Sequence, residues 1–155
     1  MEKSKRIALV AHDNRKKDLA EWVELNYRTL LNHQLICTGT TGKMVEDTIQ
    51  KRFEKEEKFE NPIIRLKSGP LGGDQQLGSM ISDGLIDMLI FFWDPMQPQP
   101  HDVDVKALLR ITVVYNIPTA CNRSTADFLI SSHLLKEEYE PRLVDYSQYI
   151  QRQIS

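Results

Sequence analysis

One short segment holds an unusual concentration of residues that could place a carboxylate beside a ligand. The segment from Ser68 to Gly78 reads SGPLGGDQQLG and contains four of the chain's seven glycines. Glycine lets the main chain turn tightly and approach a ligand closely, and Asp74 follows two glycines where a helical pattern begins. A carboxylate there could act as a general base, or it could only cap the helix. The glycine spacing is not GxGxxG, which argues against a dinucleotide-binding loop.

The segment TGTTG, from Thr38 to Gly42, has the composition of an anion-binding turn. It stands between an apolar run and a helix, where free backbone N–H groups and the positive end of the helix dipole favour a phosphate. The hydroxyl groups of Thr38, Thr40 and Thr41 add donors. A glycine-containing turn with threonine caps explains the same residues, so the pentapeptide alone supports both interpretations. Its pattern is not that of a nucleotide P-loop.

Further candidate ligand groups follow the first and fourth apolar runs. Lys16 lies one short turn after the first run and could supply a positive charge to an anion. His12 and Asp13 end that run, and His101 lies in a proline-rich loop near Asp104. Taken one at a time, each of these side chains also suits a structural hydrogen bond or an exposed position. Their significance depends on whether the fold brings them together.

Short apolar runs alternate with helical periodicity along the chain, which predicts an α/β fold. We expect a three-layer α/β/α, Rossmann-like architecture with a five-stranded, mainly parallel sheet. Apolar residues at i, i+3 and i+4 indicate the helices: Leu19, Trp22 and Val23; Leu77, Met80 and Ile81; Val105, Leu108, Leu109 and Thr112. The expected strands are Ile7–Ala11, Leu35–Thr38, Ile63–Leu66, Met88–Phe92 and Pro118–Ala120.

An open parallel sheet binds its ligand beyond the carboxyl ends of its strands. Nearly all of the unusual residues of this chain fall at that edge of the predicted sheet. The segments are His12–Asn14, Thr38–Gly42, Ser68–Gln76, Trp93–Asp102 and Cys121–Thr125.

The composition is that of an ordinary globular domain. At 155 residues, 41% apolar and 27% charged, the chain fits one domain, residues 1–155. The formal charge of -2 gives no excess of positive charge of the kind that favours binding to nucleic acid or to an anionic membrane. Cys37 and Cys121 form no disulfide framework, and the amino terminus predicts neither a signal peptide nor a membrane span. We therefore expect a cytoplasmic protein with two free thiols.

Three segments outside the predicted strands have their own interpretations. KRFEKEEK, Lys51–Lys58, is nearly all charged and predicts the solvated end of a helix, with Glu54 and Lys58 at i, i+4. DPMQPQPHD, Asp94–Asp102, predicts a loop because its prolines are incompatible with helix and strand. Residues Asp145–Ile154 could form a last helix.

A phospho-acceptor receiver domain with a bound magnesium ion is one alternative for such a fold. Asp13 and Asp94 stand at strand ends, as the carboxylates of a receiver do. A receiver also needs a lysine at the end of its last strand, where this chain has Cys121–Ser124. We therefore expect a site without a metal ion.

Taken together, the motifs resemble those of the methylglyoxal synthase family. IALVAHD, TGTTG, SGPLGGDQQ, FFWDP, PHDVDVKALLR, NIP and TADF occur in the family's order, from the first strand to about Phe128. Each motif alone is weak, but seven in order are highly specific. The resemblance implies the family's fold and the conversion of dihydroxyacetone phosphate into methylglyoxal and inorganic phosphate, a bypass of glycolysis. It also implies no metal or organic cofactor, and a homo-oligomer that is typically hexameric.

The resemblance further implies roles for individual residues. It makes Asp74 the catalytic base and His101 the side chain that contacts the reacting oxygens. Asp13, Asp94 and Asp104 match acidic positions in or around the site, and inorganic phosphate is the product and a possible inhibitor. The implied substrate and phosphate ligands are His12, Lys16, Thr38, Gly39, Thr40, Thr41, Ser68 and Gly69.

Two features depart from the family pattern. The region between TGTTG and SGP is longer here, and the added length coincides with Lys51–Lys58. The family tends to carry a C-terminal arginine that communicates between subunits, and Arg152 lies nearby without matching a fixed register. Domains of this fold also serve as regulatory phosphometabolite sensors, but a sensor needs no aspartate base and no facing histidine. The sequence therefore favours a lyase.

Overall fold

The fold is built on five strands that alternate with helices along the chain. The computed structural model describes residues 1–52, 61–97 and 102–154. The strands are β1 (Arg6–Ala11), β2 (Gln34–Thr38), β3 (Ile64–Leu66), β4 (Met88–Phe92) and β5 (Thr119–Ala120). They pair in the order β3-β2-β1-β4-β5, and each of these pairs is parallel. The predicted five-stranded parallel sheet is confirmed.

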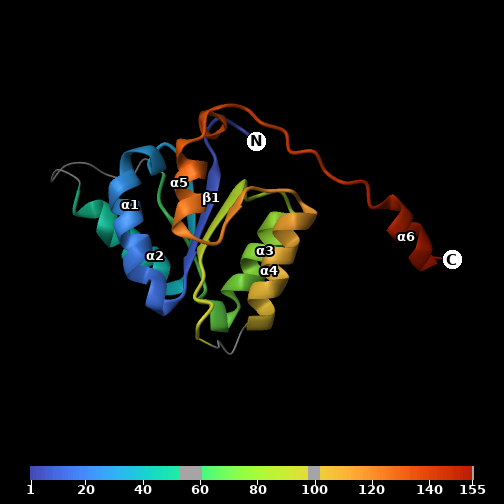
Figure 1. Ribbon diagram of the computed structural model, residues 1–155, viewed down its shortest axis with the longest axis horizontal. Helices are drawn as coiled ribbons and strands as arrows, with labels where there is room; N and C mark the ends of the chain where they lie inside the picture. The colour runs from blue at the N-terminus through green and yellow to red at the C-terminus, as the bar shows by residue number, and fades with distance from the viewer. Residues whose placement is uncertain (53–60, 98–101, 155) are drawn as a thin grey trace.

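Helices cover both faces of this sheet, so the predicted three-layer α/β/α architecture is also confirmed (Figure 1). The helices α1, α2 and α5 lie on one face, and α3 and α4 lie on the other. Their bounds are α1 (Lys16–Leu30), α2 (Gly39–Gln50), α3 (Gly73–Ser82), α4 (Asp102–Val114), α5 (Arg123–Ser131) and α6 (Ser147–Ile154). Short 3-10 turns are η1 (Asp13–Arg15), η2 (Gly69–Leu71) and η3 (His133–Lys136).

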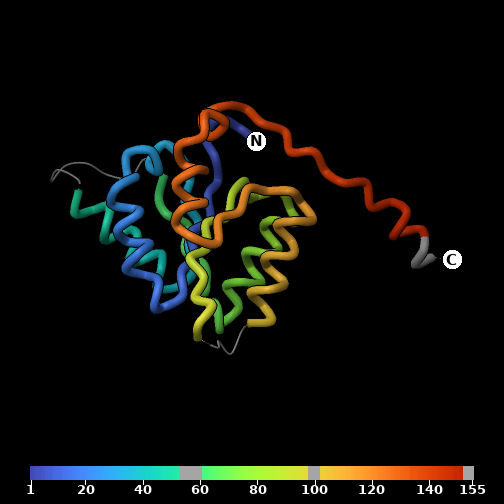
Figure 2. The backbone as a smooth tube through the Cα atoms, in the orientation of Figure 1, coloured from blue at the N-terminus to red at the C-terminus, as the bar shows by residue number. Residues whose placement is uncertain are grey.

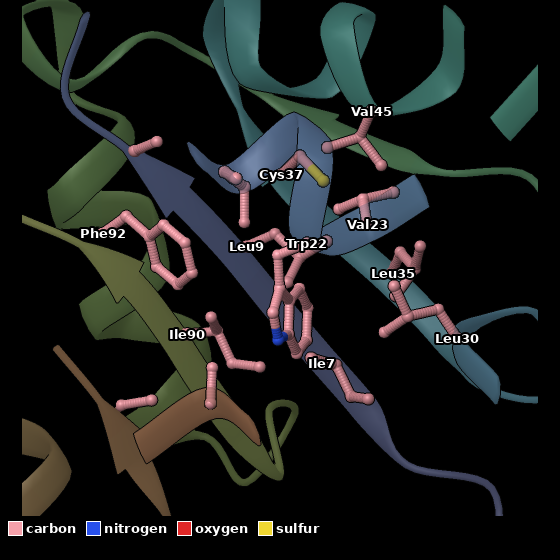
Figure 3. Packing of buried hydrophobic residues seen from close by; sticks show 14 of the residues in the cluster. Ile7, Leu9, Trp22, Val23, Leu30, Leu35, Cys37, Val45, Ile90 and Phe92 are labelled. Atoms are coloured by element: carbon pink, nitrogen blue, oxygen red, sulfur yellow. The ribbon is translucent and has the colours of Figure 1, made fainter. Parts of the chain in front are cut away.

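The core lies on both faces of the central strands. Successive side chains of a strand point to opposite faces, so Leu9 of β1 joins the cluster under α1 and α2, whereas Val10 joins the cluster under α3 and α4. Trp22 of α1 is fully buried in the first cluster, beside the sheet residues Ile7, Leu9 and Ile90 (Figure 3). Its indole Nε1 donates to Asp127 Oδ1 of α5 at 3.0 Å, which satisfies its one polar atom.

The segments with separate predictions agree with the structure in part. The last helix forms but begins at Ser147, after an extended stretch that leads away from the body of the protein (Figure 2). The described part of α2 ends at Gln50, and most of the charged segment Lys51–Lys58 lies outside the described residues. The sequence predicts a loop that includes Asp102, but Asp102 is the first residue of α4. The positive end of the helix dipole stabilises a carboxylate at that position.

The amino-terminal ends of the parallel strands lie along one side of the sheet, here called the amino edge. Polar side chains there are paired with one another or with backbone groups. Arg6 donates to the buried Asp87 through its backbone N at 2.8 Å and its guanidinium at 3.1 Å and 3.2 Å. The buried Lys5 donates its Nζ to the carbonyls of Glu2 and Glu137. The backbone N–H of Lys5 donates to Nδ1 of His33 at 2.8 Å.

The carboxyl ends of the strands lie along the opposite side, here called the carboxyl edge. This edge contains the position where the order in which strands are added to the sheet changes direction. From β1 the chain first adds β2 and β3 on one side, and later adds β4 and β5 on the other. Ligands of open α/β sheets bind at this reversal, beyond the carboxyl ends of the strands. In this chain the position lies between the ends of β1 and β4, at His12 and Trp93. Within the described residues, no helix is long and apolar enough to cross a bilayer.

Candidate active site

A cavity of about 290 Å³ opens beside this reversal, at the carboxyl ends of β1 and β2. The structure brings together ten of the candidate residues in its wall, from the ends of β1 and β2 and the loop after β3. They are His12, Asp13, Lys16, Thr38, Gly39, Thr40, Thr41, Ser68, Gly69 and Asp74. Val10, Ala11, Pro70 and Phe91 complete the lining. Residues predicted from three separate segments therefore meet around one space.

The phosphate-binding segment predicted from TGTTG is the first turn of α2. Thr38 ends β2 in an extended conformation and precedes the helix, which begins at Gly39. The first N–H groups of a helix have no partner within the helix, and in α2 they belong to residues that line the cavity. The side chain of Thr38 makes no capping hydrogen bond. An anion in the cavity would meet both unpaired amides and the positive end of the dipole.

Two glycines hold the segment Lys67–Ser68 between the starts of α2 and α3. A Cβ atom on Gly39 would lie 2.6 Å from Ser68 Cα, and φ of Gly39 is +40°. A Cβ atom on Gly73 would lie only 2.0 Å from the Lys67 carbonyl oxygen. Both approaches are possible only without a side chain. We refer to this arrangement of Gly39, Lys67, Ser68 and Gly73 as the glycine clamp.

Asp74 is the second residue of α3 and is 3% exposed. The residue that precedes the helix is Gly72, in the left-handed region at φ 106°, so the interpretation of Asp74 as the N-cap is wrong. Asp74 lines the main cavity and also a smaller one, of about 90 Å³, between α3 and α4. Asp104 of α4 also lines the smaller cavity. The carboxyl of Asp74 therefore stands between two spaces.

Lys16 supplies the positive side chain of the cavity. It is the first residue of α1, and its Nζ donates to Asp13 Oδ1 at 2.7 Å and to the hydroxyl of Thr40. The hydrogen bond and charge of Lys16 lower the pKa of Asp13 from its ordinary value. The ammonium group therefore joins the ends of β1 and β2 at the position where the first turn of α2 would hold an anion.

His12 lies between this cavity and the loop after β4. Its Nδ1 accepts the backbone N–H of Asp94 at 3.0 Å, and its ring meets Phe91 edge to face at a centroid distance of 5.1 Å. Asp94 is buried and accepts from Met96 N at 3.0 Å and from Asn14 Nδ2 at 3.1 Å. Those two hydrogen bonds are the main reason why the pKa of Asp94 is lowered. Asp94 therefore contacts His12 without lining the cavity itself.

Some predicted residues lie elsewhere, and one participant was missed. His101 falls outside the described residues. The described residues include no group of three or more His, Cys, Asp or Glu side chains that could hold a metal ion. Asn14 belongs to the predicted edge segment His12–Asn14, but no role was predicted for its side chain, which donates to Asp94. Its partner is 80 positions away, and no local motif indicated that contact.

The fold and the cavity define an α/β protein with a candidate ligand site, rich in glycine and hydroxyl groups, at the carboxyl edge of its sheet.

A family model described as the MGS-like domain matches residues 18–121. A methylglyoxal synthase from Maridesulfovibrio salexigens is 60% identical over 157 residues, covering 99% of this chain and 100% of that protein. One from Leptospira interrogans is 52% identical over 148 residues, covering 96% of this chain and 93% of that protein.

A solved structure agrees with these sequence relatives. The crystal structure of methylglyoxal synthase from Elizabethkingia anophelis is 50% identical and superimposes with a TM-score of 0.86, covering 98% of this chain and 93% of that one. The chain belongs to the methylglyoxal synthase family.

Proposed function

We propose that this protein is a carbon–oxygen lyase that converts dihydroxyacetone phosphate into methylglyoxal and inorganic phosphate. One observation supports this proposal above all others: a buried carboxyl, Asp74, lines the same cavity as the first turn of α2 and Lys16. The cavity therefore offers a base and an anion site to one small molecule. Family membership supports the same reaction.

The first chemical step is removal of a proton from the hydroxymethyl carbon of the substrate. In our proposal Asp74 takes this proton, and an enediolate forms. We assign His101 as the donor of a hydrogen bond to the developing oxyanion, because the family resemblance places a histidine at that position. The start of a helix stabilises a carboxylate as an anion, which makes Asp74 a weak base. Stabilising the enediolate therefore matters more than strengthening the base.

The second step is expulsion of phosphate from the far carbon of the enediolate. The carbon–oxygen bond to phosphate must stand roughly perpendicular to the enediolate plane, so that the electron pair can flow into it. We propose that the amides of α2, Lys16 and His12 hold the phosphate in this orientation and stabilise it as it leaves. The remaining enol gains a proton at its methylene carbon and becomes methylglyoxal.

Several properties of the family are proposed for this chain on the same basis. They are a single domain over residues 1–155, catalysis without metal or organic cofactor, a homohexamer, and inhibition by inorganic phosphate. Cys37 and Cys121 are both free in the structure. A cytoplasmic location stays a prediction from the sequence.

The direct test is incubation of the purified protein with dihydroxyacetone phosphate while methylglyoxal and free phosphate are followed separately. We expect the two products in equal amounts and without added metal. Phosphate binding without either product would instead support a phosphometabolite sensor. Absence of both binding and turnover would contradict both functions.

A further inference from the structure

We propose that Asn14 and Asp94 act as positioning residues that hold His12 as a neutral imidazole with its proton on Nε2. The basis is the hydrogen bond from the backbone N–H of Asp94 to His12 Nδ1, at 3.0 Å. A neutral imidazole has one N–H and one acceptor nitrogen. Because Nδ1 is the acceptor here, Nε2 carries the proton.

The alternative protonation states conflict with this contact. A proton on Nδ1, in the other neutral tautomer or in the imidazolium, would face the N–H of Asp94, and two donors would meet without an acceptor. Loss of that bond inside a buried site disfavours the other tautomer by roughly tenfold or more. Among the described residues, the charged groups near His12 include Asp13, Asp94, Arg15 and Lys16, and Asp74 lines the same cavity; Asp13 is already paired with Lys16.

The N–H of Asp94 has a fixed direction because its own side chain is held at two points. Met96 N donates to Asp94 Oδ1 and Asn14 Nδ2 donates to Asp94 Oδ2, at 3.0 Å and 3.1 Å. Asn14 belongs to the turn η1, directly after His12, whereas Asp94 follows β4. The side-chain hydrogen bond therefore ties the loops after β1 and β4 together, and the N–H of Asp94 is directed at the ring between them.

The consequence for the site is that His12 is a hydrogen-bond donor at Nε2. A neutral donor can bind an oxygen of the ligand without adding a positive charge to the cavity that Asp74 also lines. The donor role toward a substrate phosphate depends on the proposed function, whereas the protonation state of the free protein does not. The two claims can therefore be tested separately.

The first experiment measures the protonation of His12 in the free protein near neutral pH. Long-range ¹H–¹⁵N correlations on uniformly ¹⁵N-labelled protein distinguish a protonated from an unprotonated ring nitrogen, and a His12→Asn variant assigns the signals. We expect a protonated Nε2 and an acceptor Nδ1. His33 is an internal reference, because its Nδ1 also accepts a backbone N–H, from Lys5. A proton on Nδ1 of His12, or a charged ring, would overturn the proposal.

The second experiment exchanges the two partners of the side-chain hydrogen bond. Asn14→Asp alone places two carboxylates together, and Asp94→Asn alone places two amides together. We expect either change to move the His12 signals towards a mixture of protonation states and to weaken binding of inorganic phosphate by roughly threefold to tenfold. The double variant restores one donor and one acceptor, so both readouts should return towards the original values.

Two controls separate positioning from a general loss of structure. Asn26→Ala removes another asparagine side chain, which donates to the Trp22 carbonyl within α1, and it should leave His12 unchanged. The His33 signals should stay constant in every variant. His12 signals that stay unchanged in both single variants would refute the positioning role. If the unaltered protein binds no phosphate, the proposed function fails, while the protonation measurement still decides this inference.

Discussion

The two edges of the sheet each bury a histidine that accepts a backbone N–H at Nδ1, yet the surroundings of the two rings differ. At the amino edge, His33 accepts from the backbone of Lys5, whose ammonium group is itself paired with two carbonyls, and Arg6 pairs with Asp87 along the same edge. At the carboxyl edge, His12 adjoins a cavity bordered by helix amides and hydroxyls. We therefore expect the same hydrogen bond to contribute to stability at one edge and, under the proposed function, to ligand binding at the other.

This difference predicts that stability and function depend on different edges of the sheet. Residues of the amino edge make hydrogen bonds mainly to the protein itself. At the carboxyl edge, Gly39 and Gly73 allow close approaches of the main chain that any side chain would block. Changes at the amino edge should therefore affect the free energy of unfolding, and changes at the cavity should affect turnover.

The largest effect should follow the loss of the Asp74 carboxylate. Asp74→Asn keeps the shape of the side chain but removes its ability to accept a proton, so turnover of dihydroxyacetone phosphate should fall by roughly a thousandfold. Binding of a phosphate-bearing enediolate analogue should remain largely intact. Steady-state kinetics and calorimetric titration measure the two quantities. An equal loss of both would mean that Asp74 is only structural.

His101→Gln tests the residue that lies outside the described part of the chain. We expect slower turnover, by roughly a hundredfold, and weaker binding of the same analogue, because a hydrogen bond to the oxyanion is lost. The kinetic and titration measurements used for Asp74→Asn apply here. An unchanged rate would remove His101 from the mechanism.

Gly73→Ala should lower both stability and turnover, because the glycine clamp packs the main chain tightly and also positions Asp74. The new Cβ would overlap the Lys67 carbonyl, and we expect a loss of about 2–3 kcal/mol in the free energy of unfolding, with slower turnover. Gly78→Ala in the same helix is the matched control. A Cβ there meets no atom within 4 Å, and alanine should stabilise α3 by about 0.5–1 kcal/mol. Urea denaturation of both variants tests the contrast.

Arg6→Met tests the amino edge alone. The change leaves the buried Asp87 without its guanidinium partner, so the free energy of unfolding should fall by about 2 kcal/mol. Because Arg6 lies at the edge remote from the cavity, kcat and KM of the folded variant should stay within twofold, a rough margin for an indirect effect. A large change in kcat with unchanged stability would contradict the expectation that the amino edge affects stability and not turnover.

The smallest effect concerns pH. Burial first, and then the charges of Lys5 and Lys136, lower the pKa of His33 below its ordinary value of 6.5. As the pH falls below that value, the unfolded chain takes up a proton that the folded protein does not, so stability falls. The slope can reach about 1.4 kcal/mol per pH unit. His33→Asn keeps an acceptor for the Lys5 N–H but cannot titrate. Denaturation between pH 7.5 and pH 5.5, roughly one unit either side of the ordinary histidine value, should show a smaller slope for this variant.

The sequence predicted the sheet well because its central strands, β1, β2 and β4, are buried on both faces and read as short apolar runs. Met88–Phe92 matches its predicted bounds, and β1 begins only one residue earlier than predicted. The cavity residues were found because parallel strands bring their carboxyl ends to one edge. The pattern of glycines also indicated that Asp74 would lie at the start of α3.

The contacts within the site could not be read from the sequence. The hydrogen bond between Asn14 and Asp94 joins loops that meet only once β1 and β4 pair. The glycine clamp depends on the distance between the starts of α2 and α3, which lie on opposite faces of the sheet. His33 carried no signal, since its surroundings come from segments far apart in the chain.

The glycine clamp has a consequence for substrate selection. Because Gly39 and Gly73 touch the main chain of Lys67–Ser68 directly, no flexible side chain separates the start of α2 from Asp74. Under the proposed function, the distance between a bound phosphate and the Asp74 carboxyl is therefore set by the packing of main chain against main chain. A phosphate ester with one more carbon would carry its reactive hydrogen about 1.5 Å further on and out of register with the carboxylate. Such a molecule could occupy the cavity as an inhibitor while its chemistry stays out of reach.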